Sequence, residues 1–335
     1  MDTLEFRLDR YDALPGALAR TSVRDIRSVF PESALISLKG RRDDPLFVSI
    51  LLHGNEPVGL DVLKRLQAWM LNHPLPRSLL IFVGNVRAAE AGQRMVEGRP
   101  DYNRLWDGGE SPEHDLAARV LDEVRAAKPF AAIDLHNNTG SNPIYPCVHE
   151  TRPEDLQMAS LFAPAAMLTR NPPSMMGYAL SKICPAITAE CGRATEEAGI
   201  MRAFDFVLDM LHLDHWRGAP DRDVSLYEVT GRLEISPEAQ ISFEHDGVGD
   251  IELPANLEKW NFFERPQGSI FARLSGKQSP LRVVNDHGLD VTPQFLTRDD
   301  DRLCLTRDFT PAMLTTNETA IRADCLGYLM EKRSV

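Results

Sequence analysis

The stretch LFVSILLHGNEP, residues 46–57, decides how the fold is interpreted. Its first seven residues are dominated by large apolar side chains, which is typical of a short strand buried on both faces of a sheet. Pro57 stands where the first residue of a helix is expected, and an apolar helical stripe continues to His73-Pro74. The stretch therefore predicts a buried strand, a tight polar turn and an amphipathic helix.

The same alternation of strand and helix continues through the first two-thirds of the chain. Apolar runs predict further strands at 79–83, 130–135 and 186–190. Helices are expected to begin near Ser111 and Thr195, because such hydroxyl side chains cap helix N-termini. This alternation favours an α/β fold, in which a mainly parallel mixed sheet is flanked by helices.

The character of the sequence changes near residue 220. From about residue 222 onward the expected strands are shorter, and glycine and proline separate them, as in a small β domain. A final amphipathic helix is expected over 318–330. We therefore expect an α/β domain over 1–220 and a smaller β-rich domain over 221–335 that ends in a helix.

Composition limits the function classes. The 335 residues carry 37 basic and 49 acidic side chains, a net charge of −12, which argues against a nucleic-acid partner. The charged N-terminus is unlike a signal peptide, and no run approaches the roughly 18 apolar residues of a membrane span. The five scattered cysteines indicate neither a disulfide framework nor a cysteine-zinc site. A cytoplasmic protein without a membrane partner is expected.

Ligand-type side chains follow two of the predicted strands. His53 and Glu56 come after the first strand, and His136 ends the strand near 130–135, two residues after Asp134. In an open α/β sheet, ligands bind beyond the carboxyl ends of strands. Zinc accepts imidazole and carboxylate ligands, and a carboxylate commonly orients a ligand histidine from behind. Taken alone, the spacing of His53 and Glu56 can arise by chance, and His136 could instead hydrogen-bond to the backbone at the end of its strand.

Two further features could supply catalytic groups. Glu190 ends another predicted strand and could take a proton from a metal-activated water, or could form a salt bridge at the strand end. The segment 94–104 lies in an irregular crossover and contains Arg94 and Arg104. An arginine fork suits carboxylates, and a second arginine can stabilise an oxyanion.

In order, these motifs resemble the succinylglutamate desuccinylase/aspartoacylase family of zinc carboxypeptidase-like hydrolases. The matching pieces lie between about residues 45 and 215, and the β-rich tail fits the family's C-terminal domain. They are HGNE at 53–56, NVRA at 85–88, Arg94, DYNR at 101–104, DLHN at 134–137 and ECG at 190–192.

The resemblance implies a role for each matching residue. His53, Glu56 and His136 would bind one zinc ion per chain. Glu190 would be the general base, and Arg94 would polarise the scissile carbonyl and stabilise the oxyanion. Asn103 and Arg104 would bind a carboxylate of the substrate.

The sequence departs from the aspartoacylase pattern at two places. Where aspartoacylases carry a substrate-binding arginine shortly before the catalytic glutamate, the segment 178–182 contains only Lys182 as a basic residue. Ile321 stands where those enzymes have a substrate-binding tyrosine after an Asn-Glu pair. A less acidic or more apolar amino-acid moiety is therefore favoured over acetylaspartate. Whether Tyr178 or Lys182 contacts substrate stays open.

The function that we expect is that of a zinc-dependent amidohydrolase. It would cleave a linear amide C–N bond, removing an N-acyl group from a small amino acid-like substrate by means of a metal-activated water. One alternative is a metallocarboxypeptidase that acts on short peptides, and another is a non-catalytic relative that binds zinc or a small molecule. A homo-oligomer is possible, and the acyl group is not specified.

Overall fold

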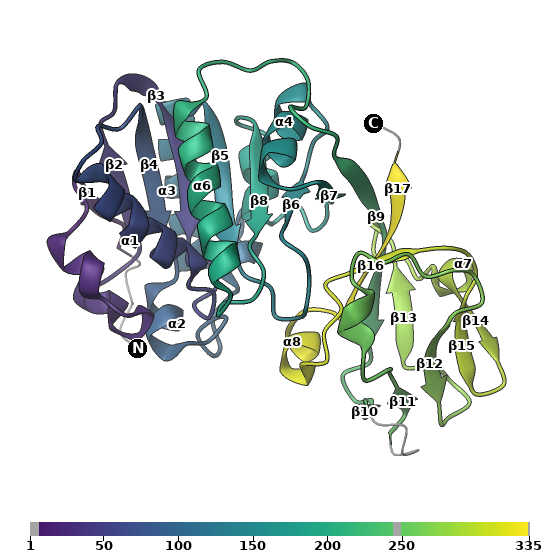
Figure 1. Ribbon diagram of the computed structural model, residues 1–335. Helices are drawn as coiled ribbons and strands as arrows, with labels where there is room; N and C mark the ends of the chain where they lie inside the picture. The colour runs from purple at the N-terminus through teal and green to yellow at the C-terminus, as the bar shows by residue number, and fades with distance from the viewer. Residues whose placement is uncertain (1–6, 244–248, 334–335) are drawn as a thin grey trace. The chain divides into compact units, whose positions relative to one another are not determined.

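The computed structural model describes residues 7–243 and 249–333 and divides into two compact units (Figure 1). The first unit contains the described residues up to 137 together with 144–224. The second contains 138–143 and the described residues from 225 onward. Within the described residues, no helix combines the length and apolar character needed to span a membrane.

The first unit is built on a mixed, mainly parallel sheet with the strand order β1-β2-β4-β3-β5-β8-β6-β7. Strands β2 and β6 each run antiparallel to a neighbour, β4 and β8 respectively. The bounds are β1 Asp9–Tyr11, β2 Ala34–Leu38, β3 Arg42–Ile50, β4 Arg77–Val83, β5 Ala131–His136, β6 Tyr145–Val148, β7 Ala165–Leu168 and β8 Ala186–Glu190. The expected fold class and the predicted strands at 79–83, 130–135 and 186–190 are thus confirmed.

Helices cover both faces of this sheet. Figure 1 shows α1 and α6 on one face and α3 on the other. The α-helices of the unit are α1 Val58–Met70, α2 Val86–Ala91, α3 Pro112–Ala127, α4 Pro153–Phe162, α5 Met176–Ser181 and α6 Glu197–His212. Shorter 3-10 turns cover Gly16–Arg20, Val23–Ser28 and Tyr102–Arg104.

Alternation along β3 explains why helices pack on both faces. Phe47 belongs to the apolar core that contains Val120 of α3. Its neighbour Val48 points the other way, toward Leu66 of α1 and Val207 of α6. Successive side chains of a strand face opposite sides of the sheet, so a strand covered on both sides is mostly apolar on both faces. This accounts for the continuous apolar run that begins at residue 46.

The second unit is β-rich and has its own apolar core. Its strands are β9 Ser225–Ile235, β10 Ile241–Ser242, β11 Ile251–Glu252, β12 Ile270–Leu274, β13 Leu281–Val284, β14 Leu296–Asp299, β15 Arg302–Leu305, β16 Thr310–Ala312 and β17 Gly327–Arg333. Its helices are the 3-10 turn Leu257–Trp260, α7 Thr292–Phe295 and α8 Glu318–Ala323. Residues 138–143 belong to this unit because Glu258 accepts a hydrogen bond from the Ser141 amide and Asn261 donates one to the Ser141 carbonyl.

The prediction of a helix over 318–330 is wrong beyond the first two turns. The helix α8 ends at Ala323, and the chain then enters β17, so the unit ends in a strand. Gly327 has φ +152° and approaches the carbonyl of Ala312 so closely that a Cβ atom would lie 2.8 Å from it. Strand β17 pairs with both β9 and β16, and Leu329 is fully buried. Two hydrogen-bonded ladders therefore outweigh the helical periodicity of this segment.

The packing of α1 predicts a large difference between two neighbouring leucines. Leu66 is buried against the sheet, whereas Leu71 is 81% exposed just beyond the helix. We expect Leu66→Ala to lower the free energy of unfolding by about 2–5 kcal/mol, because it leaves a cavity. Leu71→Ala should change it by less than about 0.5 kcal/mol. Urea unfolding followed by circular dichroism measures both, and equal effects would contradict the packing described.

Candidate metal centre

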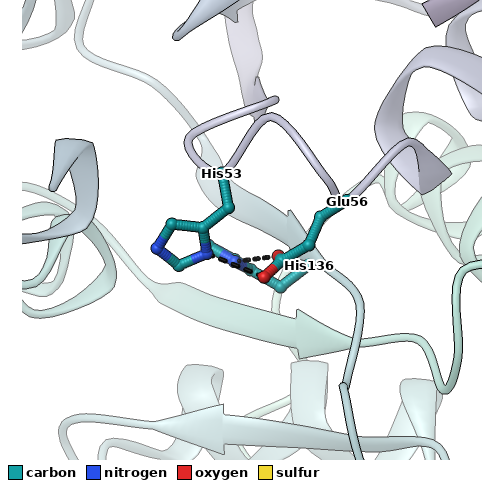
Figure 2. Close-up of side chains that lie close together, drawn as sticks. All are labelled: His53, Glu56 and His136. Atoms are coloured by element: carbon teal, nitrogen blue, oxygen red, sulfur yellow. Dashed lines mark hydrogen bonds and ion pairs between the residues drawn. The ribbon is translucent and has the colours of Figure 1, made fainter. Parts of the chain in front are cut away.

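Three buried ligand-type side chains meet at the carboxyl edge of the first unit's sheet (Figure 2). His53 and Glu56 lie in the turn between β3 and α1, and His136 is the last residue of β5. One nitrogen or oxygen of each lies within 4.8 Å of those of the other two. They converge because β3 and β5 are adjacent parallel strands, so that both strands end at the same edge.

The carboxylate of Glu56 lies between the two imidazoles. Its Oε1 is 2.8 Å from Nδ1 of His53, and its Oε2 is 2.7 Å from Nδ1 of His136. Two imidazoles and one carboxylate form a donor set found in catalytic zinc sites, where a fourth position stays open for water. The three residues expected to bind metal are thus brought together, and their donor atoms fit a zinc ion.

The outer nitrogen of each histidine contacts a second carboxylate. Nε2 of His53 lies 3.0 Å from Oδ1 of Asp101, and Nε2 of His136 lies 2.8 Å from Oδ2 of Asp134. Ser49 on β3 donates a hydrogen bond of 2.5 Å to the other oxygen of Asp134. Carboxylates in this position fix the orientation of a ligand histidine and increase its basicity.

The turn after β3 requires a glycine. A Cβ atom on Gly54 would lie 2.1 Å from the backbone of Ala88 in α2, so no larger residue fits. Asn137 secures the other side of the site. Its Oδ1 accepts a hydrogen bond from the Val58 amide at the start of α1, and its Nδ2 donates to the carbonyl of Gly192 after β8. Through these two hydrogen bonds to backbone groups, Asn137 connects the end of β5 with the start of α1 and with the turn after β8.

Burial and charge act in opposite directions on the three ligand residues. Burial raises the pKa of Glu56, but the adjacent His53 and His136 together lower it by more than burial raises it. The pKa of Glu56 therefore lies well below the usual range. Burial lowers the pKa of His136, but Asp134 and Glu56 outweigh it and hold the pKa well above its ordinary value. The pKa of His53 is raised as well, since Glu56 and Asp101 outweigh burial and Arg94. The cluster therefore attracts positive charge, as a cation site must.

Glu190 lies at the end of β8, the next parallel strand, in register with His136. Its side chain is buried, and this burial raises the pKa of Glu190 to about 7 even though the neighbouring His136 lowers it. A carboxyl group whose pKa lies near neutrality is well suited to accept and return a proton.

The arginine-containing crossover lies beside the ligand residues. Arg94 donates from Nε to Oδ2 of Asp101 at 3.0 Å, and its Nη1 lies 3.9 Å from Oε1 of Glu56. Asn103 is buried, and its Oδ1 accepts a hydrogen bond from the Met176 amide. The Nδ2 of Asn103 is therefore the donor that it could offer a substrate. Arg104 donates to the Asn103 carbonyl at 2.9 Å.

The positions that depart from the aspartoacylase pattern have other roles in the structure. Lys182 forms an ion pair with Glu150 and lies over the ring of Tyr178, 4.3 Å from its centroid. The ring of Tyr178 packs edge-on against the buried His149. Ile321 is part of the apolar core of the second unit.

Sequence reasoning identified His53, Glu56, His136 and Asp134 but gave Asp101 no role of its own. Asp101 belongs to the quoted DYNR segment, yet it is 48 residues from His53 and lies outside any strand. Sequence spacing alone carried no signal that it contacts a ligand histidine.

The sequence model of the succinylglutamate desuccinylase/aspartoacylase catalytic domain matches residues 46–210. Residues 46–210 belong to this family. The match contains every ligand and catalytic residue expected above, and it confirms the resemblance. Members of the family are deacylating hydrolases, and the first unit has the corresponding hydrolase fold.

Solved structures of the desuccinylase/aspartoacylase family share the fold. Murine aminoacylase 3 aligns with a TM-score of 0.60 at 19% identity, covering 89% of this chain and 98% of that chain. Succinylglutamate desuccinylase from Chromobacterium violaceum aligns with a TM-score of 0.57 at 19% identity, covering 88% and 86%. A succinylglutamate desuccinylase/aspartoacylase from Rhodobacter sphaeroides gives 0.59 at 15% identity, covering 89% and 88%. A search of curated protein sequences finds no match.

The two buried glutamates predict opposite effects on the stability of the metal-free protein. The pKa of the Glu190 side chain is 4.5 in the unfolded chain and about 7 in the folded protein. This difference in pKa corresponds to a free-energy difference of roughly 3 kcal/mol. The folded state thus loses stability as the pH rises from about 4.5 to 7, and the loss is complete above that range. Metal-free Glu190→Gln should therefore be more stable than wild type at pH 8 by up to about 3 kcal/mol. The two should be equal near pH 4.

Glu56 provides the matched control, because its folded pKa is lowered. Its carboxylate stabilises the fold above its unfolded pKa of 4.5, and this contribution is lost as the pH falls through the folded value. Glu56→Gln should therefore be less stable than wild type at pH 8. Chemical unfolding of chelator-treated protein measures both variants. A Glu190→Gln protein that is less stable than wild type at pH 8 would contradict the burial argument.

Proposed function

We propose that the protein is a zinc-dependent amidohydrolase that removes an N-acyl group from a small amino acid-like molecule. The observation that carries the proposal is the buried His53–Glu56–His136 cluster with Glu190 at the end of the neighbouring strand. A metal ion held by this cluster would lie near a carboxyl group whose pKa is about 7, which supports the proposal. Membership of a deacylase family supports the reaction class.

The residues of the site suggest how the reaction proceeds. Zinc, when bound, supplies Lewis-acid polarisation of the carbonyl and lowers the pKa of a water molecule. Glu190 takes the proton from the attacking water and then delivers it to the nitrogen of the leaving amine. The guanidinium of Arg94 donates hydrogen bonds to the carbonyl oxygen as negative charge develops there.

A substrate carboxylate would be held by the crossover. Arg104 offers a planar fork that matches a carboxylate, and Asn103 offers its Nδ2. Both residues lie in or next to the 3-10 turn Tyr102–Arg104, which Asp101 caps by accepting a hydrogen bond from the Asn103 amide. A fixed position of this turn would limit where an amino-acid carboxylate binds, and it would thereby orient the scissile amide toward Glu190.

The amine moiety is proposed to be neutral or apolar. Lys182, the only basic residue in the segment 178–182, is already paired with Glu150. Leu180, in the same segment, is buried in an apolar core and provides no donor to a second carboxylate. Ile321, which stands where aspartoacylases have the tyrosine, has an apolar side chain and provides none either. An acidic side chain on the substrate would lose hydration without gaining an ion pair, which disfavours binding.

Metal binding and turnover should separate in two sets of variants. Wild type should contain one equivalent of zinc, and His53→Ala and His136→Ala should lose it, because each removes a ligand. Glu190→Gln should keep its zinc but lose at least about 100-fold in kcat, because the base is removed while the ligands remain. Elemental analysis and single-substrate kinetics measure the two properties.

Exposed residues of the same type serve as controls. His212→Ala and Glu197→Gln should leave zinc content and kcat unchanged, since His212 is exposed and Glu197 is 65% exposed and paired with Arg65. Full zinc content in His53→Ala would refute the assigned site. Loss of zinc in Glu190→Gln would make Glu190 a ligand and not a base.

The departures from the aspartoacylase pattern predict a substrate preference. Zinc-loaded protein should hydrolyse acetyl derivatives of neutral and apolar amino acids with a higher kcat/KM than acetylaspartate. A panel of acetyl, succinyl and longer acyl amino acids, with a dipeptide series beside it, measures this directly. A preference for acetylaspartate would overturn the argument from Lys182. Faster cleavage of dipeptides would instead favour a metallocarboxypeptidase.

A further inference from the structure

The carboxylate of Asp101 contacts three groups of the site, which is more than the orientation of His53 requires. Its Oδ1 lies 3.0 Å from Nε2 of His53 and accepts a hydrogen bond of 2.7 Å from the Asn103 amide. Its Oδ2 receives the Nε of Arg94 at 3.0 Å and the Nη2 at 2.9 Å. One carboxylate thus touches a candidate metal ligand, the candidate oxyanion arginine and the turn that carries the candidate carboxylate clamp.

We propose that Asp101 is a positioning residue. It orients His53 for zinc binding, and it also fixes the positions of Arg94 and of the Asn103–Arg104 turn. The proposal rests on the proposed function, because it assigns the reaction's parts to these residues. Asp101 does not contact the three-ligand cluster through Glu56 or His136. It acts through His53 on one oxygen and through Arg94 on the other.

The geometry explains why a carboxylate is needed. The Nε of Arg94 donates a hydrogen bond to Oδ2 of Asp101, and its Nη2 forms an ion pair with the same oxygen. Hydrogen bonds between charged groups are short and directional. The side chain of Asp101 is only 14% exposed, so water screens the pair little. Without this anchor, Arg94 would turn toward Glu56, whose Oε1 is already 3.9 Å from its Nη1.

Asp134 is the natural comparison within the same site. Like Asp101, it is a buried carboxylate on the outer nitrogen of a ligand histidine. Its second oxygen, however, accepts from Ser49 of β3 and not from an arginine. The two aspartates therefore share the role of orienting a ligand histidine, and they differ in their contact with the catalytic and binding groups.

The experiment compares Asp101→Asn with Asp134→Asn in the full chain. An asparagine keeps the size of the side chain and one acceptor oxygen, so both variants are expected to fold, and circular dichroism and thermal unfolding check this. Zinc affinity is measured by competition with a chromogenic chelator, without any substrate. The kcat and KM for the best N-acyl amino acid are then measured at saturating zinc.

We expect both variants to bind zinc about 10- to 100-fold more weakly, as is typical when a carboxylate behind a ligand histidine is changed. At saturating zinc, Asp134→Asn should recover kcat and KM to within a few-fold of wild type. Asp101→Asn should stay at least about 10-fold lower in kcat and show a raised KM, because Arg94 and the Asn103–Arg104 turn have lost their shared anchor. Equal recovery of the two variants would overturn the proposal, as would unchanged zinc affinity in Asp101→Asn.

A double variant separates positioning from a general loss of structure. If Asp101 acts on kcat through Arg94, adding Asp101→Asn to an Arg94→Lys protein should lower kcat little further, while the loss of zinc affinity persists. Additive losses in kcat would contradict the proposed route. The zinc measurement also stands apart from the proposed function. A wild type that binds zinc through His53 but hydrolyses no amide would overturn the amidohydrolase, and leave the zinc effect of Asp101→Asn to be judged independently.

Discussion

The site depends on one geometric constraint, which is that β3, β5 and β8 are adjacent parallel strands that end at the same edge of the sheet. His53 and Glu56 follow the first of these strands, His136 ends the second and Glu190 ends the third. Residues that are far apart in the chain therefore become neighbours with little loop in between. The contacts of Asn137 with α1 and with Gly192 keep the three strand ends in place.

The second constraint is that charges gathered at a buried edge must be compensated. Each imidazole lies between two carboxylates, Glu56 on the inner side and Asp101 or Asp134 on the outer side. A buried carboxylate without a partner would cost several kcal/mol. The pairing therefore stabilises the site as well as orienting the ligand nitrogens. Glu190 is more strongly affected by burial than by its partners, and its raised pKa is the consequence.

The local features of the sequence were sufficient for most of the first unit. Apolar runs identified β4, β5 and β8, because strands covered on both faces carry mostly apolar side chains on both faces. Sequence periodicity failed at 324–330, where the expected helix ends and residues from 327 onward lie in β17, between two partner strands. Partners that are distant in sequence supply hydrogen bonds that no local pattern encodes.

The amino-acid sequence by itself determined the α/β class, the family and the side chains that can bind a metal. These conclusions follow from the apolar strand runs and from short polar motifs at the strand ends. A residue that directly follows a strand must lie at the edge of the sheet where that strand ends. Only the tertiary structure decided which groups surround them. Asp101 reaches His53 and Arg94 from an irregular crossover, and Lys182 is turned to Glu150 and Tyr178. Loop conformation depends on packing against the rest of the fold, so contacts of this kind cannot be obtained from spacing along the chain.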